Sequence, residues 1–324
     1  MAPTDLTSIE VCAGAGGQAV GLHKAGFRHK ALVEVDPDAA ESLRQNGKRT
    51  RWWPQRAVFE TSLIGWRPPH DLRGVSLIAG GVPCPPFSMA GKQLGRDDER
   101  DLFPAMLDLV DHVKPQAVMI ENVRGLLGSK FDSYRADILR RLKTLGYIGE
   151  WNLLEARDFG VPQLRPRSVL VALQKDLWQR FTWPEPNCVA PVSVGEALED
   201  LMAQDGWEGA AAWAAQASGI APTLVGGSKK HGGADLGPTR AKRTWSSELG
   251  VNGKVLANEP PQPGFRGEPK LTVEMAAVIQ GFPRGWEFAG RKTSRYRQVG
   301  NAFPPPVAHA VGASIARALR STAD

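Results

Sequence analysis

The sequence predicts an α/β protein with a second, smaller and irregular region, and three observations lead to this prediction. Residues 7–12 are typical of a strand, and a glycine-rich turn and an apolar helical pattern follow them up to Gly26. Residues 31–35 repeat the strand pattern. The short apolar runs 75–79 and 117–120 predict further buried strands. Strands that alternate with helices in this way form a sheet covered by helices.

The first turn and the end of the second strand suit a nucleotide-like ligand. The turn is Ala-Gly-Ala-Gly-Gly at 13–17, and glycines let a ligand approach the backbone. It matches neither the dinucleotide fingerprint nor a P-loop, and a tight structural turn is the alternative. Glu34 ends the second strand, where a carboxylate can accept both hydroxyls of a ribose. Asp36 and Pro37 then predict the N-cap and first turn of a helix. An adenosine-containing cofactor is therefore favoured.

Cys84 follows the strand expected at 75–79 and two glycines, at the end of a strand where an open sheet places its chemistry. Prolines at positions 83, 85 and 86 restrict the backbone around this cysteine, which suits a nucleophile held in one pose. A small buried hydrophobe is the alternative role of a lone cysteine. The polar loop 92–100 is either a solvated loop or a lid that closes over substrate.

Charged residues lie at two further strand ends. Glu121 ends the buried strand that follows the cysteine in sequence, which predicts a catalytic partner. Arg165 and Arg167 alternate into a strand expected at 168–173, so their side chains should share a face. Two cations on one face need an anionic partner, either a carboxylate of the protein or a phosphate.

The composition bounds the class of protein. The chain has 324 residues, 42% hydrophobic and 23% charged, as in soluble globular proteins, and no apolar run is long enough to span a bilayer. The N-terminus lacks the pattern of a signal peptide. Three cysteines without metal-ligand spacing favour a reducing cytoplasm and no metal. The net charge of +6 and the pI near 9.3 favour a polyanionic partner.

Five stretches together resemble the ordered motif set of DNA (cytosine-5) methyltransferases of the bacterial modification type. They are residues 10–17, 83–88, 121–123, 163–167 and 300–302, in the order and with the spacing of that family. The resemblance covers about 1–175 and 270–320. It implies a doubly wound mixed sheet of the S-adenosylmethionine-dependent methyltransferase (Rossmann-like) type. It also implies methyl transfer from S-adenosylmethionine to carbon 5 of a flipped-out cytosine in a specific short DNA duplex.

The composition changes after Trp183, where Pro184-Glu185-Pro186 interrupts the pattern and periodic helices and strands fade. Basic, glycine-rich loops follow, which suit contacts to phosphates and base edges. In the family this region is the target-recognition domain, and Thr223 belongs to a short Thr-Leu element found there. We therefore expect a catalytic and cofactor-binding domain at 1–183, a target-recognition domain at 184–270 and a C-terminal return to the catalytic domain at 271–324.

The resemblance implies a role for each site residue. Cys84 adds to carbon 6 of the base, Glu121 holds or protonates N3, and Arg167 contacts the base carbonyl. Arg165 supports the loop or a phosphate. The cofactor-binding residues implied are Cys12, Ala13, Gly14, Ala15, Gly16, Gly17, Glu34, Val35, Ser62, Pro83, Leu102, Asn301 and Ala302. The DNA-binding residues implied are Ser88, Lys92, Gln93, Thr223, Lys229, Lys230, Arg240 and Arg243.

The chain departs from the family pattern mainly around the cofactor. Glu10 stands where an aspartate is usual, Cys12 where a phenylalanine packs on adenine, and Val35 where a tryptophan is common. Ser62, or the nearby Glu60, takes the place of an aspartate that binds the adenine amino group. These departures concern cofactor affinity more than the type of reaction.

Two alternative functions deserve comparison with DNA methylation. A non-catalytic DNA-binding relative would not need Cys84, Glu121 and Arg167, which are all present. An enzyme acting on tRNA would usually carry Cys-Phe-Thr after the catalytic motif, which is absent, and the long basic segment 184–270 favours duplex DNA. We therefore expect a cytoplasmic, nucleoid-associated monomer that binds double-stranded DNA, with a possible cognate restriction endonuclease that acts independently.

Overall fold

The computed structural model describes residues 5–83, 101–186, 191–227 and 233–320. The chain forms two compact units. Unit 1 comprises Met1–Leu154, Pro166–Glu185 and Ala308–Asp324, and unit 2 comprises Glu155–Arg165 and Pro186–Val307. The residues 271–307 thus belong to unit 2. The domain boundaries expected at 183/184 and 270/271 were assigned by function and not by compactness, and they stay a prediction.

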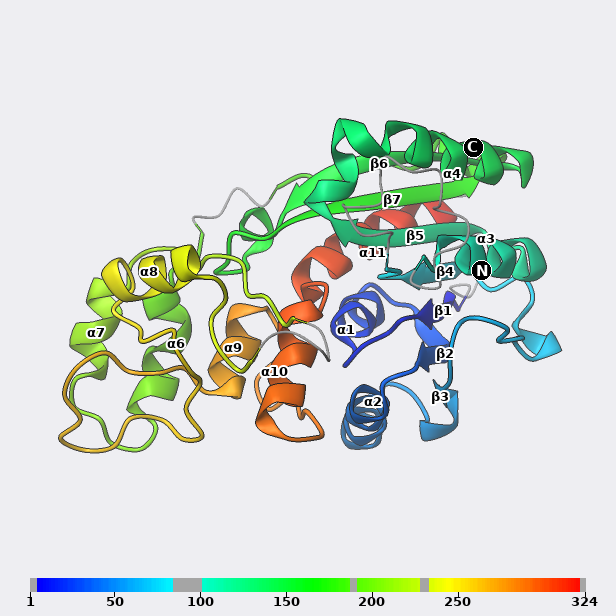
Figure 1. Ribbon diagram of the computed structural model, residues 1–324. Helices are drawn as coiled ribbons and strands as arrows, with labels where there is room; N and C mark the ends of the chain where they lie inside the picture. Colours follow the sequence, from blue (N-terminus) through cyan, green and yellow to red (C-terminus); the bar gives the residue numbers. More distant parts are fainter. Residues whose placement is uncertain (1–4, 84–100, 187–190, 228–232, 321–324) are drawn as a thin grey trace. The chain divides into compact units, whose positions relative to one another are not determined.

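Unit 1 is built on a seven-stranded sheet with the order β3-β2-β1-β4-β5-β7-β6 (Figure 1). Strands β1 to β5 pair in parallel, and β7 runs antiparallel to β5. The sheet is therefore mixed, as expected. Its strands are β1 Thr7–Val11, β2 Arg28–Glu34, β3 Val58–Glu60, β4 Leu77–Gly80, β5 Ala117–Val123, β6 Tyr147–Glu155 and β7 Pro166–Gln174.

Helices cover both faces of this sheet. They are α1 Gly17–Lys24, α2 Pro37–Thr50, α3 Phe103–Val113, α4 Asp132–Thr144, α5 Lys175–Trp178 and most of α11 Pro305–Arg320. Ile9 and Val11 pack in one apolar core with residues of α3 and α4. Ser8 and Glu10 alternate with them and so face the other side, where His29 contacts both and also the Ala19 carbonyl of α1. The doubly wound α/β fold is confirmed.

The sequence signals at the start of α2 are confirmed by its geometry. Asp36 is the N-cap, and its Oδ1 accepts from the backbone N–H of Asp38 over 3.0 Å and of Ala39 over 3.4 Å. Pro37 occupies the first turn, where its missing N–H costs nothing. This cap fixes the direction of the chain directly after Glu34, the acid expected to bind a ribose.

Unit 2 contains more helix than the sequence pattern indicated. Its helices are α6 Val194–Ala203, α7 Ala210–Gln216, α8 Thr239–Ser247, α9 Val273–Ile279 and α10 Lys292–Asn301. Of these, α6, α7 and α8 lie in the segment where periodicity fades. In α8 Trp245 is the buried residue, so that helix leaves almost no apolar period in the sequence. Helix α6 does carry one, with Val194, Leu198 and Leu201 buried at helical spacing, but sequence reasoning missed it. No helix in the described part of the chain is long and apolar enough to cross a membrane.

Candidate active site

An ion pair of Glu121 and Arg167 lies at the carboxyl end of β5. Arg167 enters the antiparallel neighbour β7, and its Nε donates to Glu121 Oε1 over 2.8 Å. Each of the two side chains is only 11% exposed. A carboxylate and a guanidinium taken out of water stabilise each other only when they stay in contact, so the pair is held in one arrangement. This edge of the sheet therefore presents a carboxylate beside a fixed cation.

The backbone that leads to Cys84 passes directly beside this pair. Asn122 Nδ2 donates to the Val82 carbonyl oxygen over 2.8 Å, which ties the end of β5 to the residues after β4. A Cβ added at Gly81 would lie 3.0 Å from Glu121 Oε2, so the backbone here approaches that carboxylate closely. Cys84 itself lies outside the described residues, as do Ser88, Lys92, Gln93, Lys229 and Lys230.

The residues that follow position 100 are bonded to those that precede position 84. Leu102 N donates to the Pro83 carbonyl oxygen over 3.3 Å, so two residues expected at the cofactor are joined to each other. Asp101 Oδ1 accepts from Phe103 N over 3.0 Å and from the Tyr134 hydroxyl over 2.7 Å. The two ends of the catalytic motif loop are thus anchored next to one another.

Glu34 is held as a buried acceptor at the end of β2. Its Oε2 accepts from Gly14 N over 2.8 Å and its Oε1 from Asp36 N over 2.7 Å. Burial raises the pKa of this carboxyl above its ordinary 4.5, and the hydrogen bonds from Asp36, Gly14 and Val35 oppose the rise. Each carboxylate oxygen has a further lone pair, so Glu34 can still accept two hydroxyl donors.

The glycine turn leaves room for a ligand beside Glu34. Gly14 and Gly16 adopt positive φ values of 55° and 92°, and Gly16 is the N-cap of α1. A Cβ at Gly14 would meet no protein atom within 4 Å, so open space adjoins its backbone. Ala13 N donates to the Val33 carbonyl oxygen over 3.1 Å and thereby fixes the turn against β2. Ala15 and Gly17 are buried.

Two neighbours of Glu34, Cys12 and Val35, offer neutral groups that an adenosine could contact. Burial and the charge of Glu34 raise the pKa of Cys12 to about 12, so its thiol stays protonated. Val35 is 65% exposed and offers an apolar surface. Ser62 Oγ accepts from Ile64 N over 3.1 Å, and the alternative residue Glu60 pairs with an arginine. The acceptor carboxylate, the open glycine turn and the neutral thiol together fit an adenosine-containing cofactor.

Arg165 has backbone carbonyls as partners within unit 2. It is 1% exposed, and its guanidinium donates to the carbonyl oxygens of Leu224 over 2.7 Å, Gly300 over 2.7 Å and Ala302 over 3.0 Å. These contacts support the loop-holding role among the roles expected for Arg165. They bring the Thr-Leu element and the segment of Asn301 and Ala302 to one point.

Gln163 completes this junction, which we call the Gln163–Arg165 junction. Its Oε1 accepts from Leu224 N over 2.9 Å, and its Nε2 donates to Gln280 Oε1 over 2.8 Å. Gln163 and Ala221 form a parallel β-bridge. The Thr223 hydroxyl donates to the Leu164 carbonyl oxygen. The motif 163–165 therefore holds the Thr-Leu element like a short strand.

Sequence reasoning assigned no role to three residues that the structure places in these arrangements. Asn122 anchors the backbone before Cys84, while Gln163 and Gln280 are fully buried in the Gln163–Arg165 junction. Asn122 and Gln163 lie inside motifs quoted for the family resemblance, so those motifs were the available signal, whereas Gln280 lies in none of the five. Asn301, expected at the cofactor, donates from Nδ2 to the Gly227 carbonyl oxygen over 3.1 Å in unit 2.

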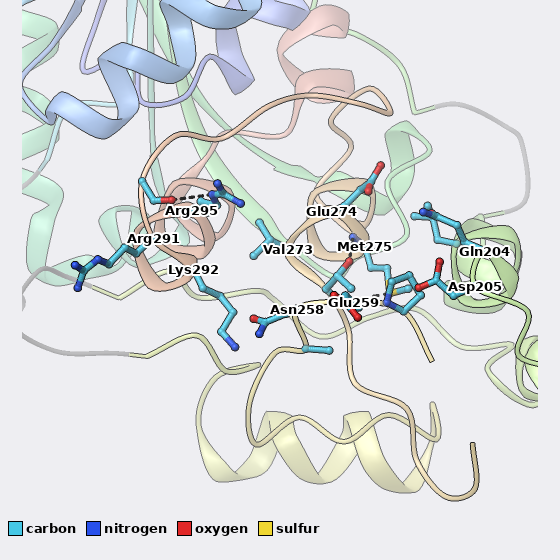
Figure 2. A pocket seen from close by; sticks show the side chains of 15 residues that line it. Gln204, Asp205, Asn258, Glu259, Val273, Glu274, Met275, Arg291, Lys292 and Arg295 are labelled. Carbon is cyan, nitrogen blue, oxygen red and sulfur yellow. Dashed lines mark hydrogen bonds between the residues drawn. The ribbon is translucent and has the colours of Figure 1, made fainter. Parts of the chain in front are cut away.

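A pocket of about 780 Å³ in unit 2 lies apart from the expected site residues (Figure 2). Its charged lining residues are Asp205, Glu259, Glu274, Arg291, Lys292 and Arg295. Figure 2 shows the three basic side chains on one side and Asp205 and Glu259 on the other. This mixture of charges does not suit a polyanion. Among the described residues, no cluster of histidine, cysteine or acidic side chains could hold a metal ion.

Comparison with known proteins identifies the class. The profile of the C-5 cytosine-specific DNA methylase family matches residues 6–317. The chain therefore belongs to the C-5 cytosine-specific DNA methylase family, and it is a DNA (cytosine-5) methyltransferase. This confirms the family expected from the five motifs.

Individual relatives agree with this assignment. The chain is 61% identical to the type II methyltransferase M.NaeI of Lentzea aerocolonigenes, over 97% of this chain and 75% of the relative. It is 50% identical to the type II methyltransferase M.NgoMIV of Neisseria gonorrhoeae, over 97% of this chain and 98% of the relative. The fold is similar to that of a prophage-encoded DNA modification methyltransferase of E. coli, with a TM-score of 0.66 and 20% identity over 98% and 100% of the two chains. The fold is also similar to that of Spodoptera frugiperda DNMT2, with a TM-score of 0.64 and 17% sequence identity over 94% of this chain and 97% of that one.

Proposed function

We propose that this protein transfers a methyl group from S-adenosylmethionine to carbon 5 of a flipped-out cytosine in a specific short DNA duplex. The observation that carries the proposal is the buried Glu121–Arg167 pair beside the backbone that leads to Cys84. The relatives named as type II methyltransferases support a role in a restriction-modification system, in which the protein acts independently of a cognate endonuclease.

Cys84 has the role of nucleophile, because carbon 5 of cytosine does not attack an electrophile unaided. The thiolate adds to carbon 6, and the electron pair of the 5,6 double bond becomes available at carbon 5. A free cysteine has a pKa of about 8.5, so ionisation near neutrality needs a cationic or helix-end environment. After methylation, loss of the proton at carbon 5 expels the thiolate and restores the ring.

Glu121 and Arg167 make carbon 6 electrophilic. Glu121 holds or protonates N3 of the base, which withdraws electrons from carbon 6. Arg167 donates to the base carbonyl and stabilises the charge that develops during addition. Their mutual contact of 2.8 Å holds both groups in place before the base arrives. Little reorganisation is then needed in the transition state.

Glu34 and the glycine turn bind the cofactor in this proposal. Glu34 accepts the two ribose hydroxyls, while Gly14 and Gly16 allow the methionine portion to lie against the backbone. When bound, S-adenosylmethionine supplies an electrophilic methyl group. The base must leave the helix to meet these groups, because carbon 6 is inaccessible in a stacked duplex.

The test is covalent trapping on DNA that carries 5-fluorocytosine. Fluorine at carbon 5 cannot leave as a proton, so the adduct should persist on a denaturing gel when S-adenosylmethionine is present. We expect a band from wild type and from Cys188→Ala, the matched control, and none from Cys84→Ala. Glu121→Gln should slow trapping by about 10²–10⁴-fold, because the addition step loses its general acid.

Two outcomes would contradict the proposal. A stable band from Cys84→Ala would mean that another group is the nucleophile. Equal trapping rates for wild type and Glu121→Gln would leave Glu121 as a structural carboxylate. Circular dichroism of each variant separates both outcomes from a failure to fold.

A further inference from the structure

Helix α8, Thr239–Ser247, has one buried and one exposed face. Trp245 is fully buried, and its carbonyl oxygen accepts from Val251 N over 2.8 Å. Leu236 before the helix and Leu249 after it are also buried. The helix is thus fixed to unit 2 by its apolar side and by the segments at its two ends.

The entry to α8 is fixed by Asp235. Its Oδ1 accepts from Gly237 N over 2.9 Å and lies 3.1 Å from Lys242 Nζ. Lys242 N also donates to the Pro238 carbonyl oxygen over 3.0 Å. These contacts neutralise Lys242 and set the direction of the helix axis, so α8 is a rigid element and not a fluctuating loop.

Two arginines of α8 remain unengaged within the described part of the chain. Arg240 and Arg243 are exposed, and no hydrogen bond or ion pair to another described residue involves either guanidinium. Arg284 of unit 2, by contrast, pairs with Asp200 over 2.7 Å. Residues three apart on a helix are neighbours on its surface, so both guanidinium groups project from one face.

We propose that α8 enters the major groove of the target duplex and that Arg240 and Arg243 each read a guanine there. This rests on the proposed function and names part of the substrate. An α-helix fits the major groove of B-DNA, and arginine binds the O6 and N7 atoms of guanine through two hydrogen bonds. A rigid helix with two free guanidinium groups on one face meets this geometric requirement.

The experiment uses the full-length protein and a duplex library with randomised sequence. Bound duplexes are sequenced after selection, and methylated cytosines are mapped by bisulfite sequencing. In Arg240→Ala and in Arg243→Ala, the preference for guanine should fall by about 5- to 150-fold, each at a different position of the target. Arg240→Lys should lose the same preference, because lysine keeps the charge but not the paired hydrogen bonds. Arg266→Ala, an exposed arginine of unit 2 outside α8, is the matched control and should keep the preference.

Contact of these arginines with phosphates would give a different result. Binding would then weaken uniformly across sequences, the salt dependence would become shallower, and the guanine preference would persist in both alanine variants. That result would overturn the proposal. The selection step reports base preference without methyl transfer, so it tests α8 even if bisulfite mapping shows no methylation and the proposed function fails.

Discussion

At the scale of single residues, two opposing effects act on the pKa of Glu34. Burial raises its pKa, while backbone N–H donors from Asp36 and Gly14 stabilise the ionised form. The net direction is upward from 4.5. Because the folded pKa exceeds the unfolded one, the unliganded protein loses the contribution of Glu34 to its stability as pH rises through the interval between the two values.

Cofactor binding should depend on pH with the opposite sign. In the proposed cofactor site, ribose hydroxyls donate to the ionised carboxylate, so binding should favour the ionised form. The Kd for S-adenosylmethionine should fall by up to about tenfold per pH unit as pH rises toward the raised pKa, and then level off. Titration calorimetry in two buffers of different ionisation enthalpy should detect release of a proton within that range. In Glu34→Gln the Kd should be higher and should no longer change with pH in this range. If the variant instead showed the same pH dependence of Kd as wild type, Glu34 would not be part of the cofactor site.

At the scale of elements, central strands of unit 1 such as β4 and β5 were predictable because burial on both faces leaves continuous apolar runs. The run 117–120 corresponds to β5, Ala117–Val123, and the acid predicted at its end is Glu121 of the Glu121–Arg167 pair. Helix α8 was not predictable, since Trp245 alone marks its buried side. The partner of Arg167 was left open between a carboxylate and a phosphate, because pairing between β5 and β7 is not visible in a local pattern.

The role of Gln163 was not predictable for a related reason. Its partners Leu224 and Gln280 lie 61 and 117 residues away in the chain, so no local spacing reveals them. Sequence reasoning could place Gln163 in a motif but could not show that this motif holds the Thr-Leu element.

We expect Gln163→Leu to weaken DNA binding without affecting the cofactor. The substitution leaves Leu224 N and Ile279 O buried without their present partners, at about 1–3 kcal/mol for each group. If the Thr-Leu element binds DNA, the Kd for the target duplex should rise about tenfold or more, while the Kd for S-adenosylmethionine stays unchanged. Fluorescence anisotropy and calorimetry measure the two constants. Gln216→Leu, on the exposed side of α7, is the control. A lower Tm with unchanged DNA affinity would show that the junction is structural only.

At the scale of the whole molecule, we expect target choice and chemistry to occupy separable stretches of chain. Leu236 N donates to the Gly253 carbonyl oxygen over 3.0 Å, and Leu256 N donates to the Ala234 carbonyl oxygen over 2.8 Å. The stretch 234–256, which includes α8, is thus closed by its own backbone. The residues before 228 are held instead by the Gln163–Arg165 junction and by Asn301. We therefore propose 228 and 256 as the ends of a specificity module, although Asn252 N also donates to the Pro269 carbonyl oxygen over 2.9 Å.

Replacing residues 228–256 with the corresponding segment of a relative that has a different target should change the methylated sequence and leave the reaction intact. Bisulfite sequencing of plasmid DNA from expressing cells would report the target, and cofactor binding should be unchanged. A graft of 223–243 is the matched control, because it cuts between Arg165 and Leu224 at one end and between the paired backbones of 234–256 at the other. We expect that graft to lower the Tm, since it sets foreign residues at 224 and 236 against the unchanged Arg165 and Gly253. If the 228–256 graft is folded and active but methylates the original sequence, specificity resides outside this stretch.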